Sequence, residues 1–422
     1  MKTCKPQRMI GMWQTLRAIS SICILIVISS FVQAQENLGR NPFFIEPEVV
    51  LGKAGNGYTG FPKTGIRATG QVSFGVANTK GVDWAKYFNS PHTGVSASFS
   101  ATGNVDILGY EISVVPYVLF NPIKKLKRPF YLKIGFGASY FTKHYNATTN
   151  RENKAIGSPV SWAYQMFAYQ SLYISERMNW KLGVGWTHAS TGHISLPNFG
   201  LNSFSASLAV QVFTKPNGPV VIKGEPLEKL PKVPNRYTVN VRHGFGFHAL
   251  GGTEPKSDNT IKPVYALAIS GGIIVNRFVK IKLGVSYRFY QHFHDYLLQE
   301  GFEQYIDQPV VNTSAVSIFF GPEFLLGHVG LDMEVGINVH NPFYKQYFDD
   351  FKPGPSEGFG YVSKNLISQR IGFNVYLFNV KKSPVHNVSL GAHINVNFGE
   401  ADFSEFSLSY TWTIIQKKET DL

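Results

Sequence analysis

Hydrophobic and polar residues alternate along most of the chain after its first 40 positions. In FYLKIGFGASYF, Phe130, Leu132 and Ile134 share one parity, whereas Lys133 and Gly135 have the other. A period of two is that of a β-strand, whose successive side chains point to opposite faces. The pattern therefore predicts strands with one apolar face and one polar or small face.

About sixteen segments of the chain have this character, and the fold class they predict is all-β. The predicted strands lie near 42–52, 67–77, 92–102, 107–121, 129–144, 160–176, 179–190, 203–214, 235–250, 262–275, 277–292, 314–326, 327–340, 365–378, 386–399 and 403–416. The chain contains 33 Phe, 21 Tyr and 40 Gly with 16% charged residues. Aromatic and small residues spread over many alternating segments are typical of an antiparallel transmembrane β-barrel, whose strands face lipid on one side and a lumen on the other.

The amino-terminal segment separates this interpretation from a water-soluble sandwich, which would also alternate. Residues 1–34 combine basic residues, the apolar run ISSICILIVISSFV and the small-residue site Val32-Gln33-Ala34, which predicts a signal peptide. Both cysteines, Cys4 and Cys23, lie inside it, so we expect a mature protein without disulfides in a bacterial envelope. The net charge of +13 favours anionic lipid as a partner, because the sequence shows no nucleic-acid-binding module. These features predict a membrane-embedded protein of the outer membrane.

The strands fall into two sets of eight. Residues 35–214 form one predicted half and residues 236–422 a second half of unknown role, separated by the proline- and lysine-rich linker or loop 215–235. About eight strands suffice for the smallest barrels, so two eight-stranded barrels and one larger barrel both fit this pattern.

One predicted strand end carries candidate chemistry. In GWTHASTGHISLPNFGLN, His188 and Ser190 are two residues apart and therefore share a face. They continue the parity of Leu182 and Val184, which predicts that they point toward lipid. An imidazole beside a hydroxyl accepts its proton as the oxygen attacks an ester carbonyl. Trp186, on the same face, suits the membrane interface where an acyl ester lies, so we assign it to substrate binding.

The run from His188 through Leu196-Pro197-Asn198-Phe199-Gly200-Leu201-Asn202 resembles the lipid A 3-O-deacylase (PagL-type) family, which includes proteins called acyloxyacyl hydrolases. The resemblance implies an eight-stranded outer-membrane barrel over residues 36–214, with its specific motif in 187–202. It implies Ser190 as nucleophile, His188 as base, and Asn202 at a position that is acidic in the best-known members.

Two departures from the family pattern affect the site. Asn202 accepts the imidazole N–H through its side-chain oxygen but cannot stabilise the imidazolium by charge. Thr191 replaces the family's asparagine after the serine, so Thr191, Gly192 and His193 together are the candidate oxyanion site, with the backbone N–H groups near Gly192 and His193 as donors.

The sequence thus predicts a serine–histidine ester hydrolase that removes an acyl chain from lipid A or a related glycolipid at the outer leaflet, with no metal and no cofactor. The alternative is a non-enzymatic porin or structural barrel in which both halves form one wide pore. Parity places a later pair, His393 and Glu405, in the lumen, and His292 with His294 are interpreted as strand-end polar residues rather than metal ligands.

Overall fold

The computed structural model describes residues 41–78, 83–123, 126–215, 234–251, 260–352 and 358–414. The predicted signal peptide 1–34 and most of the predicted linker 215–235 lie outside these residues. Within them, no helix is long and apolar enough to cross a membrane.

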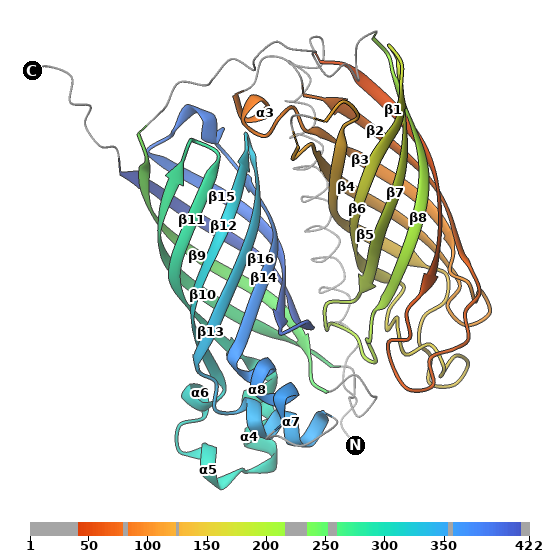
Figure 1. Cartoon of the computed structure of the whole chain (residues 1–422). Coiled ribbons are helices and arrows are strands. Elements are labelled where there is room, and N and C mark those ends of the chain that lie inside the picture. Colours follow the sequence, from red (N-terminus) through yellow and green to blue (C-terminus); the bar gives the residue numbers. More distant parts are fainter. Residues whose placement is uncertain are drawn as a thin grey trace, which may run out of the picture.

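The first half folds into a closed antiparallel barrel, hereafter barrel 1 (Figure 1). Each strand pairs with the next along the chain, and β1 pairs with β8, for example through Val49 and Leu208, to close the sheet. A short helix, α3 (Asp83–Tyr87), lies between β2 and β3. The strands of barrel 1 are β1 (Phe43–Ala54), β2 (Arg67–Ala77), β3 (His92–Ala101), β4 (Tyr110–Phe120), β5 (Phe130–Phe141), β6 (Val160–Ile174), β7 (Met178–Ser190) and β8 (Leu201–Phe213).

The second half forms its own closed antiparallel barrel, barrel 2, in which β16 pairs with β9. Its strands are β9 (Arg236–Ala249), β10 (Ile261–Val275), β11 (Val279–Tyr290), β12 (Ser314–Leu326), β13 (Val329–His340), β14 (Ile367–Tyr376), β15 (His386–Asn397) and β16 (Glu400–Ile414). Its helices are α4 (Gln291–Glu300), α5 (Glu303–Ile306), α6 (Pro309–Asn312), α7 (Tyr344–Phe351), α8 (Phe359–Leu366) and the 3-10 turn η1 (Val380–Lys382).

The all-β prediction is confirmed, and of its two versions the two-barrel one is correct. The single wide pore is wrong, because β1 and β9 each close a separate sheet with the last strand of their own half. The predicted strand 277–292 also runs too far. β11 ends at Tyr290, and the next residues begin α4.

Outward faces of both barrels are apolar, as a lipid-exposed surface requires. On β7, Leu182 and Val184 are 50% and 63% exposed, whereas the adjacent Lys181, of opposite parity, is fully buried in the lumen. Lys181 Nζ lies 2.6 Å from Glu46 Oε2, so its charge is paired inside the barrel. A buried ion is tolerated only with such a partner, because desolvation of an isolated charge costs several kcal/mol.

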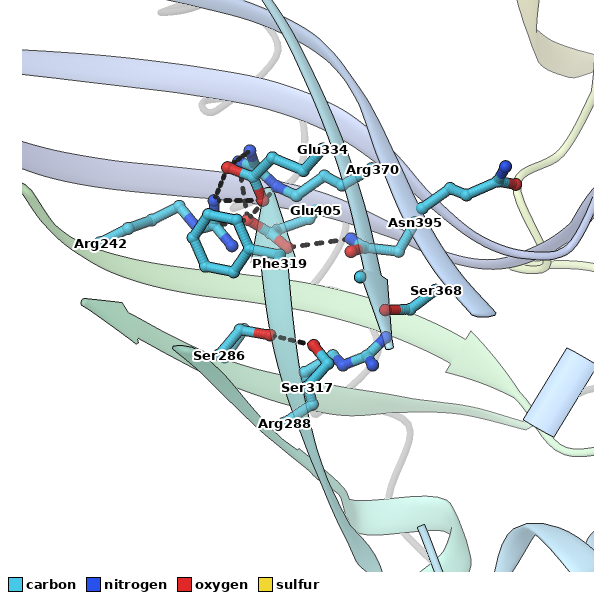
Figure 2. Close-up of a pocket in the computed structure, with 13 residues that line it drawn as sticks. Arg242, Ser286, Arg288, Ser317, Phe319, Glu334, Ser368, Arg370, Asn395 and Glu405 are labelled. Atoms are coloured by element: carbon cyan, nitrogen blue, oxygen red, sulfur yellow. Dashed lines mark hydrogen bonds and ion pairs between the residues drawn. The ribbon is translucent and has the colours of Figure 1, made fainter. Parts of the chain in front are cut away.

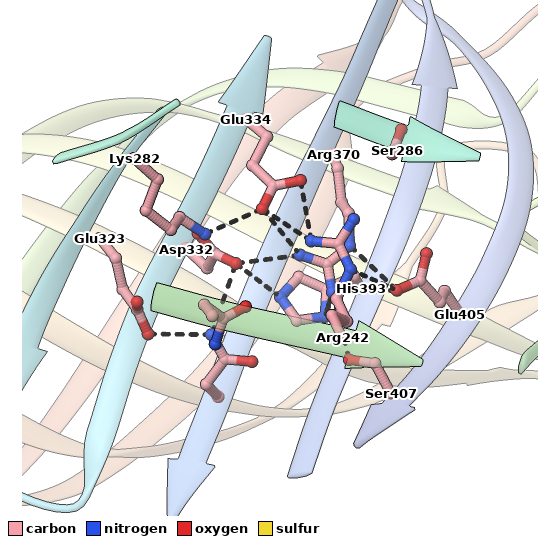
Figure 3. A network of polar contacts seen from close by, with 12 residues as sticks. Arg242, Lys282, Ser286, Glu323, Asp332, Glu334, Arg370, His393, Glu405 and Ser407 are labelled. Carbon is pink, nitrogen blue, oxygen red and sulfur yellow. Dashed lines mark hydrogen bonds and ion pairs between the residues drawn. The ribbon is translucent and has the colours of Figure 1, made fainter. Parts of the chain in front are cut away.

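The lumen of barrel 2 holds a larger network of charges (Figure 3). Arg370 is central, with its guanidinium 2.9 Å from Asp332, 3.0 Å from Glu405 and 2.8 Å from the ring of His393. Lys282 pairs with Asp332 at 2.6 Å. A small cavity lies beside this network, and its lining includes Ser286 and Ser317 (Figure 2). Paired charges thus cross-link the strands through the interior of barrel 2.

The two barrels lie side by side with corresponding ends together (Figure 1). One end, the Ser190 end, holds the β7–β8 loop of barrel 1 and helices α4 to α8 of barrel 2. The opposite end, the α3 end, joins the barrels through Arg277 and Asp83, whose charged atoms are 3.3 Å apart.

Candidate active site

Strand β7 places Trp186, His188 and Ser190 on the outward face of barrel 1. They have the parity of the exposed Leu182 and Val184, and the residue opposite His188 on β8 is Asn202. His188 and Trp186 are partly exposed, whereas Ser190 is only 3% exposed. The side chains of the predicted trio thus project from the outer surface of the sheet and not into the lumen.

Asn202 fixes the orientation of the histidine ring. Its Oδ1 lies 2.9 Å from His188 Nδ1 and 3.1 Å from Trp186 Nε1. The indole N–H can only donate, so the amide atom it meets is an acceptor, which assigns Oδ1 to this position. His188 Nδ1 must then carry its proton and donate to Oδ1. The other ring nitrogen, Nε2, is left as the basic atom of the neutral imidazole.

The hydroxyl of Ser190 is held by the chain that follows it. Gly192 N–H donates to Ser190 Oγ over 3.3 Å. Between these two described side chains, Ser190 and His188, the structure has no hydrogen bond. The two side chains nevertheless share the outward face of β7. Catalytic hydrogen bonds commonly tighten once substrate is bound.

In the loop after β7, Thr191 already uses both of its hydrogen-bond donors within the loop. Thr191 N–H donates to Asn198 Oδ1 at 2.9 Å, and Thr191 Oγ1 donates to the Ser195 carbonyl at 3.0 Å. Both donors of Thr191 are therefore occupied in shaping the loop, which argues against the predicted oxyanion role of this residue. The Gly192 N–H already lies beside the serine oxygen. Gly192 has φ +63°, a left-handed conformation that suits glycine.

The stretch that carries His188, Ser190 and Asn202 also matches a known protein family. Residues 71–211 match the lipid A 3-O-deacylase (PagL) family. The match runs from β2 to β8 and contains His188, Ser190 and Asn202, so the resemblance found in the sequence is confirmed for this part of barrel 1. No curated protein matches the chain. The deacylase family and the two antiparallel barrels identify an outer-membrane protein.

Similar solved structures are distant from this chain. The crystal structure of the outer membrane enzyme PagL has 14% identity and a TM-score of 0.29, covering 39% of this chain and 97% of its own. BamA from Haemophilus ducreyi, lacking POTRA domains 1–3, has 13% identity and a TM-score of 0.20, covering 89% and 71%. CdiB from Acinetobacter baumannii has 8% identity and a TM-score of 0.16, covering 88% and 60%.

His193, the third predicted oxyanion residue, leaves the deacylase-like barrel and packs against barrel 2. Its ring stacks on His248 with 4.8 Å between centroids, and its backbone carbonyl accepts from Ala249 N–H at 2.9 Å. Burial, followed by the charge of Lys352, lowers the pKa of His193 to about 3, whereas Glu400 acts in the opposite direction. The side chain is therefore neutral at ordinary pH and holds the loop against barrel 2.

Sequence reasoning missed Ser404 of barrel 2. It accepts a hydrogen bond from Trp162 Nε1 at 2.7 Å, and Trp162 lies opposite Ser190 in the β6–β7 register. One signal was available in the sequence: in FSEFSLSYTW, Ser404 shares its parity with Phe406 and Leu408. A serine in a lipid-facing stripe indicates a polar partner outside its own sheet.

Other candidate residues lie away from the site. His393 and Glu405 are buried in the lumen of barrel 2, where both contact Arg370. His292 and His294 belong to α4, and the described residues contain no group of three or more His, Cys, Asp or Glu that could hold a metal ion.

Proposed function

We infer that barrel 1 is an ester hydrolase that removes an ester-linked acyl chain from lipid A or a related glycolipid. The observation that carries this proposal is the outward-facing pair of His188 and Asn202 beside Ser190, within the region that matches the deacylase family. A soluble substrate does not require a site on the lipid-facing stripe of a strand, whereas a membrane lipid does.

In the proposed reaction, Ser190 Oγ attacks the ester carbonyl carbon and its proton passes to His188 Nε2. Asn202 keeps the proton on Nδ1 and the ring in place. The carbonyl oxygen becomes an oxyanion, which the Gly192 N–H stabilises. As the tetrahedral intermediate collapses, the bond to the sugar oxygen breaks and His188 returns the proton to that oxygen. Water, activated by the same histidine, then hydrolyses the acyl-serine and releases the fatty acid.

The exposed face of β7 and β8 provides a surface for the acyl chain. Val184 and Phe204 are 63% and 66% exposed, and both are outward-facing. A lipid beside them extends its chain along this stripe, and its ester then lies level with Trp186 and His188. We propose that the odd-numbered strands run outward, which would put this end at the outer leaflet, where lipid A is held. Basic loops there would attract the substrate phosphates.

Mass spectrometry of lipid A from cells that express the protein tests the proposal. Wild type is expected to remove one acyl chain, and Ser190→Ala to leave lipid A intact. Ser203→Ala is the matched control, because Ser203 is a buried serine on the lumen face of the neighbouring strand, opposite Thr187. Equal acylation with wild type and Ser190→Ala, both correctly inserted, would contradict a hydrolase and favour a structural barrel.

A further inference from the structure

Two hydrogen bonds from barrel 2 hold the loop that follows Ser190. At its start, Ser404 Oγ lies 3.4 Å from the Gly192 carbonyl and donates to it. At the next residue, Ala249 N–H donates to the His193 carbonyl. The His193 ring is 2% exposed and lies against His248 at the Ser190 end of barrel 2. The carbonyls of Gly192 and His193, two consecutive residues of the loop, thus both have their donors in the other barrel.

Ser404 is an unusual member of its strand. It faces outward on β16, in line with Phe406 and Leu408, yet is only 4% exposed, because barrel 1 covers it. A methyl group added to Gly192 would lie 2.3 Å from Ser404 Oγ, closer than real atoms approach. The contact therefore requires both a glycine in barrel 1 and a small hydroxyl residue in barrel 2.

The same hydroxyl also holds Trp162, whose indole N–H donates to it. Trp162 stacks on Phe136 with 5.0 Å between ring centroids, and Phe136 contacts Phe373 of β14. Ser404 of barrel 2 is thus bonded both to Trp162, which lies beside Ser190 in the sheet, and to Gly192, two residues after Ser190 in the chain.

We propose that Ser404 of barrel 2 is a positioning residue for the reaction in barrel 1: by holding the Gly192 carbonyl it limits rotation of the Gly192 backbone, and so keeps the Gly192 N–H directed at the developing oxyanion. This rests on the proposed function. A donor that is fixed before the reaction stabilises the transition state more than one that must be ordered during it. Glycine gives the loop its backbone freedom, and barrel 2 removes that freedom. The second barrel is then part of the enzyme and not only a neighbour of it.

The geometry favours positioning over a lid that blocks the site. Barrel 2 contacts the β5–β6 side of Ser190 through Phe136 and Trp162. On the β7–β8 side, Val184 and Phe204 remain open to lipid. Lipid therefore reaches the open side of His188 without displacement of barrel 2, and loosening the contact is expected to slow the reaction, not to accelerate it.

Steady-state kinetics of the full-length protein in mixed micelles with purified lipid A tests the proposal. Ser404→Ala is expected to lower kcat about tenfold with KM changed less than about twofold, because transition-state stabilisation is lost while ground-state binding is kept. Trp162→Phe is expected to lower kcat, and the double variant to be no slower than the slower single variant, because both remove one linkage. Arg277→Ala, which breaks the contact at the α3 end, is the control and leaves kcat unchanged. A kcat for Ser404→Ala at or above that of wild type overturns the proposal, as do losses that multiply in the double variant.

Hydrogen exchange separates failure of this inference from failure of the proposed function. Backbone exchange over residues 190–200 is expected to accelerate in Ser404→Ala and to stay at the wild-type rate in Arg277→Ala. Equal rates in wild type and Ser404→Ala overturn the positioning role whether or not lipid A is hydrolysed. Absence of Ser190-dependent hydrolysis in wild type overturns the proposed function, and the exchange rates still decide whether barrel 2 holds the loop.

Discussion

Replacement of Asn202 by aspartate tests the role of the histidine partner with almost no change of shape. The amide oxygen already lies 2.9 Å from His188 Nδ1 and accepts a hydrogen bond from it. In Asn202→Asp a carboxylate oxygen takes this place, and the indole N–H of Trp186 keeps an acceptor at about the same position. The variant therefore adds one negative charge beside a ring that becomes positive when it receives the serine proton.

The size of the effect follows from this distance. Coulomb's law with an effective dielectric constant of about 20 gives about 6 kcal/mol for unit charges separated by the 2.9 Å of this contact. Most of this attraction offsets the cost of partly desolvating the carboxylate. A hydrogen bond to a charged group exceeds a neutral one by about 1–1.5 kcal/mol, which corresponds to about a five- to fifteenfold increase in kcat.

Release of fatty acid from purified lipid A in micelles measures this change. We expect Asn202→Asp to raise kcat and leave KM near the wild-type value, because Asn202 acts on the imidazolium of the transition state and not on bound substrate. Asn202→Ala is the companion variant and lowers kcat, since His188 loses its orienting acceptor. A kcat that falls in Asn202→Asp, or that is unaffected by both substitutions, refutes the assignment of Asn202 as the histidine's partner.

Three further changes have expected outcomes. Gly200→Ala places a methyl group 2.6 Å from His188 Cε1 at a residue with φ +74°, so lipid A hydrolysis is expected to fall at least tenfold in micelles while the barrel still shows heat-modifiable migration on gels. Arg370→Ala leaves Glu405 and the other lumen carboxylates without their central cation, which is expected to destabilise barrel 2 by about 3–5 kcal/mol in urea titrations. The pKa of His193 is about 3 in the folded protein. Between its ordinary value near 6.5 and 3 the folded state binds fewer protons than a released loop, so hydrogen exchange over residues 190–200 should accelerate as pH falls below about 6, beyond the intrinsic pH effect, and His193→Phe should abolish this acceleration.

The strands, and the face to which each side chain points, could be predicted from the sequence because a barrel wall is a local pattern repeated many times. Lys181 between Leu182 and Trp180 already indicates which side of β7 is the lumen, and the structure places Lys181 there. The helices near the Ser190 end could not be predicted in this way. In QHFHDYLLQE, His292 continues the polar parity of β11 although α4 already begins at Gln291, so period alone extends the strand too far.

The outward direction of the candidate site also follows from local parity, whereas its burial does not. His188 and Ser190 share the parity of Val184, which the sequence shows directly. Ser190 contacts the loop after it, and its neighbour in the sheet, Trp162, is bonded to Ser404, more than two hundred positions away. No periodicity within barrel 1 carries information about a partner at that separation. The hydrogen bonds that occupy Thr191 likewise depend on how the loop closes on Asn198.

Polar residues in the lipid-facing stripes nevertheless carry a long-range signal. A hydroxyl in hydrocarbon without a partner costs several kcal/mol, so an outward serine within an apolar stripe requires a bonded group from outside its sheet. Ser404 on β16 is of this kind, because it is nearly inaccessible in the folded chain and is bonded to Trp162 and Gly192 of barrel 1. For two barrels in one chain, such residues identify the strands that face each other. By this reasoning the strand ends near Ser190 and Ser404 become one structural unit, and a single barrel expressed alone would expose the loop that carries the proposed oxyanion donor.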